Sequence, residues 1–289
     1  MQQLKHSGAG GFLGRLILLS AVMLTGCSLP ESDLSDTSYP EQATYVCAPG
    51  TRTGMPGKTD ELLTGEGIRY YVRTPLNYDS RIAHPLMMVF SPGDRGGLGT
   101  EWFTGLTTEA TRLGFIVVYA DNRPRKTPSM NRPLTREWIL ELGTIPALVA
   151  AEWCIDENRI FLAGHSNGGT ISTALALLDE SPIKPAALAP SAAGFRAQDL
   201  RTFSCPEPMS VLVMHSNNDS LFPGYGAEAA QWWKQCNQCP GSARTLGAGC
   251  SAFQDCKDNV STIYCEGEKR HSVWPERNDR ILSFFAGIK

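Results

Sequence analysis

The sequence has no long run of basic residues and no apolar run long enough to cross a membrane as a helix. Its 26 Lys and Arg residues are outnumbered by 29 Asp and Glu residues, and the formal net charge is −3. Proteins that bind nucleic acid need a basic patch, so we expect no nucleic-acid partner. The apolar run at residues 16–24 is shorter than the roughly 20 residues of a membrane-spanning helix. An ordinary membrane span is therefore not expected there.

Histidine is scarce and internal repeats are absent. Only five histidines occur in 289 residues, which leaves few candidates for a general base. The apolar content of 42% and the charged content of 19% are typical of a globular protein with a substantial core. A chain of this length without repeats suits one large α/β domain, which we place at residues 47–289.

The N-terminus has the pattern of an export signal. Lys5 and Arg15 precede the apolar run 16–24, which ends in Leu24-Thr25-Gly26-Cys27. That ending resembles the bacterial lipoprotein box, in which the cysteine is lipidated and becomes the first residue. We therefore predict a lipoprotein signal peptide at 1–26 and a lipidated flexible tether at 27–46, which is rich in Ser, Pro, Asp and Glu. The alternative is a plain secretory signal with a chance cysteine.

These features predict an exported protein, either a cell-envelope lipoprotein or a secreted one. A lipid on Cys27 would be its only contact with a membrane. Eight further cysteines follow, and an even number in an exported chain predicts disulfides. Eight cysteines allow 105 pairings, so the connectivity stays open. Zinc binding by the cluster between Cys236 and Cys265 is the less favoured alternative, because zinc sites use similar short spacings.

Short apolar runs alternate with stretches of helical periodicity after residue 47. Ile68–Arg73 is rich in β-branched and aromatic residues and predicts an edge strand. Buried parallel strands are predicted at 86–90, 115–119, 159–163, 186–189 and 211–214. Helices are predicted at 138–154, 170–178, 227–236 and 279–285. The alternation predicts an α/β fold with a mostly parallel central sheet and helices on both faces.

Residues 164–168 have the sequence Gly-His-Ser-Asn-Gly, which matches the pattern G-x-S-x-G. The pattern alone is weak, but a predicted strand precedes it and a predicted helix follows it. A strand–turn–helix elbow exposes a serine above the sheet, and its glycines avoid clashes in the tight turn. We therefore predict Ser166 as a catalytic nucleophile. The alternative is a glycine-rich connection with an exposed serine.

A serine nucleophile needs a histidine base that is oriented by a carboxylate. In α/β-hydrolases the chain order is serine, acid, histidine. His165 adjoins Ser166 in a tight turn and should point elsewhere, which leaves His215 and His271 after the nucleophile. The order favours His271, in the loop before the last predicted helix.

Asp219 is the predicted acid, because it follows the predicted strand 211–214. Its rivals lie in the cysteine-rich segment and lack that position: Asp255, Asp258, Glu266 and Glu268. His215 then supports the acid loop.

The tetrahedral intermediate needs two backbone N–H donors. One should come from Asn167, the residue after the nucleophile. The other is expected from the glycine-rich loop 91–97 that follows the first core strand. Pro92 has no N–H, so Gly93 is the predicted donor and Asp94 the second choice. This chemistry needs no cofactor and no metal.

Two segments carry a resemblance to a known family. Residues 215–223 read His-Ser-Asn-Asn-Asp-Ser-Leu-Phe-Pro, and residues 271–275 read His-Ser-Val-Trp-Pro. They resemble the H-G-T-x-D-x-x-V-P and G-H-x-W-P segments of the bacterial esterase family that includes poly(3-hydroxybutyrate) depolymerases and feruloyl and acetylxylan esterases. The resemblance spans roughly residues 47–285 and implies an α/β-hydrolase fold with Ser166, Asp219 and His271 as the triad.

The chain departs from that family at three places. Ser91-Pro92 stands where the family has His-Gly, which makes the geometry of the oxyanion loop an open question. Ser216 and Arg270 replace glycines. Arg270 either favours an anionic substrate or faces solvent. Among the tryptophans, Trp274 is the candidate for the substrate cleft because it lies near His271, although aromatic residues more often belong to the core.

We therefore expect an exported serine carboxylesterase that works through an acyl-enzyme. Its substrate would be a polyester, a plant cell-wall ester or a small aryl ester. A catalytically inactive binding lipoprotein is one alternative, which the Ser91-Pro92 loop motivates. A serine peptidase on the same fold is another, because a triad does not distinguish an ester from an amide.

Overall fold

The computed structural model describes residues 47–124 and 133–288. The predicted signal peptide at 1–26 and the tether at 27–46, with the lipidation candidate Cys27, lie outside the described residues. Within the described ranges, no helix is both long and apolar enough to cross a membrane.

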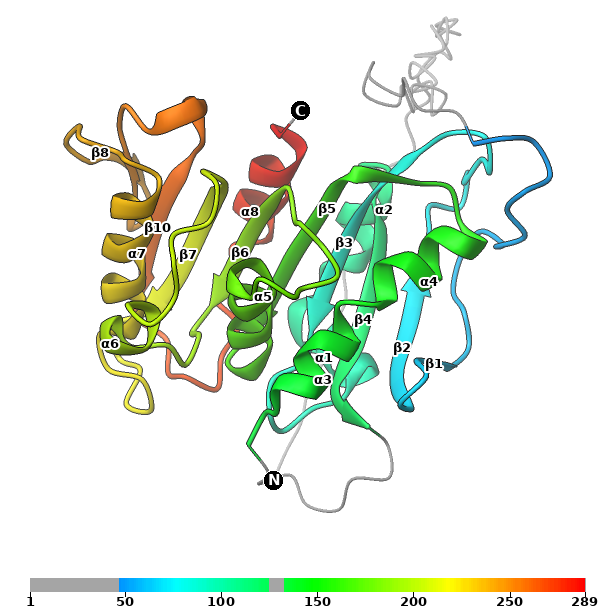
Figure 1. Ribbon diagram of the computed structural model, residues 1–289, viewed down its shortest axis with the longest axis horizontal. Helices are drawn as coiled ribbons and strands as arrows, with labels where there is room; N and C mark the ends of the chain where they lie inside the picture. The colour runs from blue at the N-terminus through cyan, green and yellow to red at the C-terminus, as the bar shows by residue number, and fades with distance from the viewer. Residues whose placement is uncertain (1–46, 125–132, 289) are drawn as a thin grey trace, which may run out of the picture. The chain divides into compact units, whose positions relative to one another are not determined.

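The described residues form one sheet of ten strands in the order β1-β2-β4-β3-β5-β6-β7-β10-β9-β8 (Figure 1). The strands are β1 (Leu62–Leu63), β2 (Ile68–Arg73), β3 (His84–Phe90), β4 (Ile116–Pro124), β5 (Ile155–His165), β6 (Ala187–Ser191), β7 (Ser210–Ser216), β8 (Arg244–Gly247), β9 (Cys250–Phe253) and β10 (Thr262–Gly267). From β4 to β10 every neighbouring pair is parallel. The mostly parallel sheet expected from the sequence is confirmed. Ile68–Arg73 is not the edge strand, however, because β1 pairs with its outer side.

The central strands are buried on both faces. In β3, Leu86, Met88 and Phe90 enter one core, while Met87 and Val89 enter the other. All five side chains are fully buried. This alternation follows from the two-residue period of a strand, and it explains why the segment is continuously apolar.

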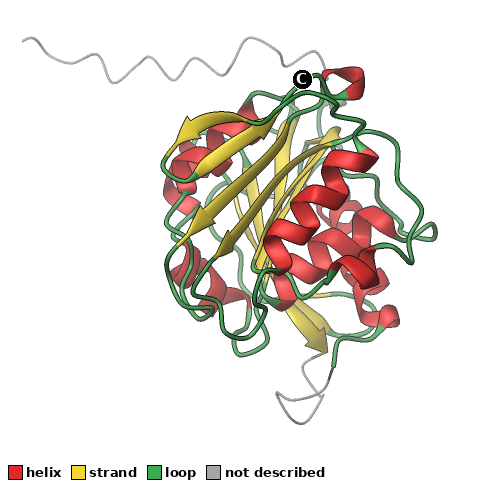
Figure 2. Ribbon diagram, turned by 90° about the vertical axis from the view of Figure 1, so that its left-hand side faces the viewer, coloured by secondary structure: helices red, strands yellow, loops and turns green. Residues whose placement is uncertain are grey.

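Helices cover both faces of the sheet (Figure 2). They are α1 (Gly97–Thr104), α2 (Thr107–Arg112), α3 (Arg136–Leu142), α4 (Ile145–Glu152), α5 (Asn167–Leu177), α6 (Ala197–Leu200), α7 (Tyr225–Cys236) and α8 (Asn278–Ala286). Helices α2 and α8 contribute to the core that contains Met87, and α3, α4, α5 and α7 contribute to the core that contains Leu86. The short helices α1 and α2 were not predicted from the sequence.

The single helix expected at 138–154 is in fact two helices, α3 and α4. Gly143 separates them, and a Cβ there would lie 2.7 Å from the Cγ of Pro182. Pro146 lies in the first turn of α4 and has no N–H with which to continue the α3 hydrogen-bond ladder. The helix therefore breaks for two reasons: Gly143 packs closely against Pro182, and Pro146 lacks the N–H that a continuous helix would use.

Four disulfides join the eight cysteines that follow residue 46. The pairs are Cys47–Cys154, Cys205–Cys236, Cys239–Cys256 and Cys250–Cys265. The expectation of disulfides is confirmed, and the zinc alternative loses its thiolate ligands because these sulfurs are bonded to each other. The cysteine-rich segment forms the three strands β8, β9 and β10, of which β10 leads directly to the loop that contains His271.

Candidate active site

Ser166 lies at a strained turn between β5 and α5. Its backbone has φ 55° and ψ −116°, a region that non-glycine residues rarely occupy. The turn is tight enough to exclude side chains at both flanking glycines. A Cβ at Gly164 would lie 2.5 Å from the Gly168 backbone, and one at Gly168 would lie 2.0 Å from the Phe90 carbonyl oxygen. The main-chain N–H of Ser166 donates to Ser191 in β6 at 2.9 Å, which fixes the turn to the sheet.

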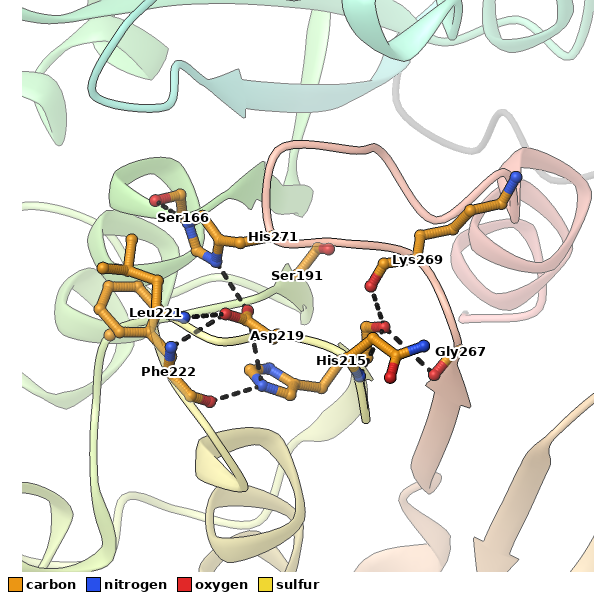
Figure 3. Close-up of polar contacts among 12 residues, drawn as sticks. Ser166, Ser191, His215, Asp219, Leu221, Phe222, Gly267, Lys269 and His271 are labelled. Carbon is orange, nitrogen blue, oxygen red and sulfur yellow. Dashed lines mark hydrogen bonds and ion pairs between the residues drawn. The ribbon is translucent and has the colours of Figure 1, made fainter.

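The structure brings Ser166, His271 and Asp219 together from three separate parts of the chain (Figure 3). The Nε2 atom of His271 lies 2.8 Å from the Ser166 Oγ atom, and its Nδ1 atom lies 2.6 Å from the Asp219 Oδ2 atom. With Nδ1 protonated toward the carboxylate, Nε2 is free to accept the serine proton. A hydroxyl, an imidazole and a carboxylate in this order form the arrangement that activates a serine nucleophile.

Asp219 is held in one orientation by main-chain donors. The N–H groups of Leu221 and Phe222 both donate to its Oδ1 atom at 2.9 Å, so its Oδ2 atom faces His271. Burial alone would raise the pKa of Asp219. The bonds from His271 and Phe222, together with the nearby imidazoles, outweigh burial and lower that pKa. The Asp219 carboxylate is therefore ionised beside His271.

His215 supports the acid loop, as expected. Its Nε2 atom lies 2.8 Å from the Phe222 carbonyl oxygen and 3.6 Å from the Asp219 carboxylate. Burial lowers the pKa of His215 despite these neighbours, which favour the charged form. A neutral imidazole donates its Nε2 proton to the carbonyl and so holds the turn that presents Asp219.

The loop after β3 lies beside the elbow. Ser91 is fully buried, and its hydroxyl donates to the Ala120 carbonyl oxygen at 2.6 Å. A Cβ at Gly93 would lie 3.1 Å from the side-chain nitrogen of Asn167, so this glycine packs directly against the residue after the nucleophile. Asp94 is exposed. Both residues expected to donate backbone N–H groups, Gly93 and Asn167, therefore lie next to each other.

Searches for similar proteins found relatives that are esterases, while no family model matches the chain. Feruloyl esterase B from Piromyces equi is 24% identical over an alignment of 227 residues that covers 67% of this chain. The chain spans about 40% of the length of that relative.

Solved structures agree on the architecture. An acetyl xylan esterase from Aspergillus awamori superposes with a TM-score of 0.60 at 14% identity, over 78% of this chain and 98% of its own. A ferulic acid esterase from Anaeromyces mucronatus superposes with a TM-score of 0.52 at 14% identity, over 86% of this chain and 97% of its own.

The chain has the α/β-hydrolase fold. The resemblance to feruloyl and acetyl xylan esterases that the sequence predicted is confirmed. The resemblance to poly(3-hydroxybutyrate) depolymerases stays a prediction.

In this domain of α/β-hydrolase fold, His165 bonds to Ser191 and to the main chain of His271 and does not bond to Ser166. Its Nε2 atom lies 2.5 Å from the His271 carbonyl oxygen, and its Nδ1 atom lies 3.0 Å from the Ser191 hydroxyl. Burial lowers the pKa of His165 to about 4, against the opposing effect of the His271 carbonyl. The neutral ring therefore donates to His271 and accepts from Ser191. The sequence indicated only that this side chain points elsewhere.

Side chains of the acid loop also bind the loop of the base. The hydroxyl of Ser216 donates to the carbonyl oxygens of Lys269 and Gly267, and the amide of Asn218 donates to the Glu268 carbonyl oxygen at 2.7 Å. The hydroxyl of Ser216 therefore links the two loops. Local sequence offers no signal for these bonds because the partners are about 50 residues apart.

Trp274 is mostly buried, although it is among the residues that line a groove between α1 and α8, and its place in the substrate cleft stays a prediction. Only 4% of it is exposed, and its indole N–H donates to the Asn278 side chain at 2.8 Å. Its ring packs edge-on against Phe103 and His165 and so supports the loop of the base. Trp102, which is 82% exposed, lines the same groove, whose volume is about 920 Å³. Arg270 is exposed at the surface.

Proposed function

We propose that this α/β-hydrolase domain is a serine carboxylic-ester hydrolase with Ser166 as nucleophile, His271 as general base and Asp219 as the residue that orients the base. The observation that carries the proposal is the continuous hydrogen-bonded series from the Ser166 hydroxyl to His271 at 2.8 Å and on to Asp219 at 2.6 Å. The strained backbone of Ser166 supports it, because such strain is typical of functional sites.

The reaction follows from the geometry. His271 accepts the proton of Ser166 while the serine oxygen attacks the ester carbonyl. The N–H groups of Gly93 and Asn167 stabilise the oxyanion, and His271 then protonates the leaving alcohol as the acyl-enzyme forms. Water, deprotonated by His271, attacks the acyl-enzyme and releases the acid and the free serine. Asp219 keeps Nδ1 protonated and stabilises the imidazolium in both halves of the cycle.

Esters of aromatic or small acids are the substrate class we propose. The relatives that support this choice are a feruloyl esterase, an acetyl xylan esterase and a ferulic acid esterase. A polyester remains the second substrate class, from the sequence resemblance to depolymerases.

A fluorophosphonate probe tests the nucleophile without knowledge of the substrate. We expect labelling of Ser166, mapped by mass spectrometry, and loss of labelling in Ser166→Ala and His271→Ala. The matched control is Ser272→Ala, an exposed serine beside His271, which should keep wild-type labelling. A folded, disulfide-intact domain that takes no label would overturn the proposal and favour the inactive binding protein.

The choice between ester and amide substrates needs a second comparison. Hydrolysis of matched aryl esters and anilides should favour the esters, because an alcohol needs less assistance to leave than an amine. Preference for the anilide would point to the serine peptidase instead.

We also propose that the protein is exported and lipidated on Cys27. The basic and apolar segments before that residue support this, and so do the four disulfides, which are typical of exported proteins. Intact-mass measurement of protein extracted from membranes should show a chain that begins at an acylated Cys27. A chain that begins elsewhere without lipid would indicate plain secretion.

A further inference from the structure

The carbonyl groups of the loop after β3 are held by side chains from the end of the neighbouring strand β4. The amide nitrogen of Asn122 donates to the carbonyl oxygens of Ser91 and Pro92, and the guanidinium of Arg123 donates to the Gly93 carbonyl oxygen. Three consecutive carbonyl groups of the loop therefore have donors on β4.

Asn122 is fixed by its surroundings. It is 2% exposed, and its side-chain oxygen accepts from the Nε of Arg123 at 2.8 Å. Because oxygen faces a donor and nitrogen faces two acceptors, only one orientation of the amide satisfies the hydrogen bonds. The Pro92 carbonyl oxygen also accepts from the Arg95 N–H at 3.4 Å. An apolar side chain at position 122 would remove the side-chain donor from both the Ser91 and the Pro92 carbonyls, and losing a donor to a buried carbonyl is costly.

This arrangement determines where the N–H groups of the loop point. In a trans peptide the N–H and the carbonyl point in opposite directions, and the described residues contain no cis peptide bond. When the carbonyls of Pro92 and Gly93 face β4, the N–H groups of Gly93 and Asp94 face the opposite side.

The opposite side is the side of the nucleophile. Strand β3 lies between β4 and β5 (Figure 1). Ser166 follows β5 directly in the chain. The packing of Gly93 against Asn167 confirms that the loop approaches the elbow on this side. The N–H groups of Gly93 and Asp94 therefore point toward the end of β5.

We propose that Asn122, assisted by Arg123, is a positioning residue that turns the Pro92 and Gly93 carbonyls toward β4 and thereby directs the Gly93 and Asp94 N–H groups at the oxyanion formed on Ser166. This inference rests on the proposed function. It explains how a loop with Ser91-Pro92 in place of His-Gly presents its donors, since the loop is oriented from the neighbouring strand.

The test compares Asn122→Ala and Asn122→Asp with the wild-type domain on p-nitrophenyl acetate. The aspartate variant has nearly the same size but cannot donate to the carbonyls, so it serves if the alanine variant does not fold. The matched control is Asn237→Ala. Asn237 is fully buried, and its side-chain amide also donates to the main chain, at the Met209 carbonyl oxygen at 2.8 Å. It is far from the elbow in the sequence.

We expect kcat to fall about 10- to 100-fold in both Asn122 variants, somewhat less than the loss of a whole oxyanion donor, with KM changed less than about threefold. Affinity for an aryl trifluoromethyl ketone, whose serine adduct carries an oxyanion, should fall by the same factor as kcat/KM. Asn237→Ala should change neither quantity by more than about twofold.

Two results overturn the inference in distinguishable ways. In the first, the wild-type domain is active, and the Asn122 variants lose no more activity or ketone affinity than Asn237→Ala does. This result overturns the positioning role alone. A wild-type domain that hydrolyses no ester and takes no fluorophosphonate label overturns the proposed function, and the positioning role with it.

Discussion

The neutral state of His165 makes the stability of the domain depend on pH. Its ring nitrogens both have partners in the folded state, and burial lowers its pKa from 6.5 to about 4. In the unfolded chain the ring titrates near 6.5. As the pH falls below 6.5, the unfolded chain binds the proton first, so the free energy of unfolding decreases. The decrease continues until the pH falls through about 4, where the folded domain is protonated as well.

The size of the effect follows from this pKa difference. One pKa unit corresponds to 1.36 kcal/mol, so His165 alone should reduce the free energy of unfolding by about 3 kcal/mol between pH 7 and pH 4. That is a large part of the roughly 5–15 kcal/mol typical of natural domains.

The assay is guanidinium unfolding of the wild type and of His165→Gln at several pH values from 7 to 4. Glutamine keeps a donor near the position of Nε2 and has no proton to gain, so the difference between the two proteins isolates His165. His84 and His215 also have lowered pKa values, but they are present in both proteins and cancel. We expect the wild type to lose about 3 kcal/mol more than the variant over this range. If the free energies of unfolding of the two proteins changed in parallel with pH, the reasoning would be refuted, because His165 would then have the same pKa in the folded and the unfolded state.

Two further predictions concern the acid and the first disulfide. Asp219→Asn should leave the fold intact and lower kcat for ester hydrolysis about 10³- to 10⁴-fold, as in other serine triads. The amide neither stabilises the imidazolium nor holds the required tautomer. A loss below about tenfold would exclude Asp219 as the orienting acid. The double variant Cys47→Ser/Cys154→Ser opens a link between residues separated by 107 positions, and it should lower the free energy of unfolding by about 4 kcal/mol without changing kcat at 25 °C, which guanidinium unfolding and initial rates would check.

Local patterns in the sequence were sufficient to predict the central strands and the elbow. Continuously apolar segments such as residues 86–90 predict strands that are buried on both faces, and the structure places them there. The glycines around Ser166 indicate the tight turn because a Cβ at Gly164 or Gly168 would collide with the backbone. Chain order then selected Asp219 and His271, the two residues that the structure brings to Ser166.

Other features depend on contacts that local patterns do not contain. The break between α3 and α4 results partly from Pro182, which is far along the chain from Gly143. The burial of Trp274 results from packing against Phe103 and from a bond to Asn278. A tryptophan near a predicted base has the same local sequence whether its ring faces a ligand or the core.

The sequence by itself determined the central strands, the turn at Ser166 and the types of residue available for catalysis, because each depends on neighbours along the chain. Only the tertiary structure decided how the site is held together. His165 supports the loop of His271, Ser216 links that loop to the acid loop, and Asn122 orients the loop of Gly93. These bonds join residues that are 30 to 106 positions apart, and such partners meet only when the order of strands in the sheet is established.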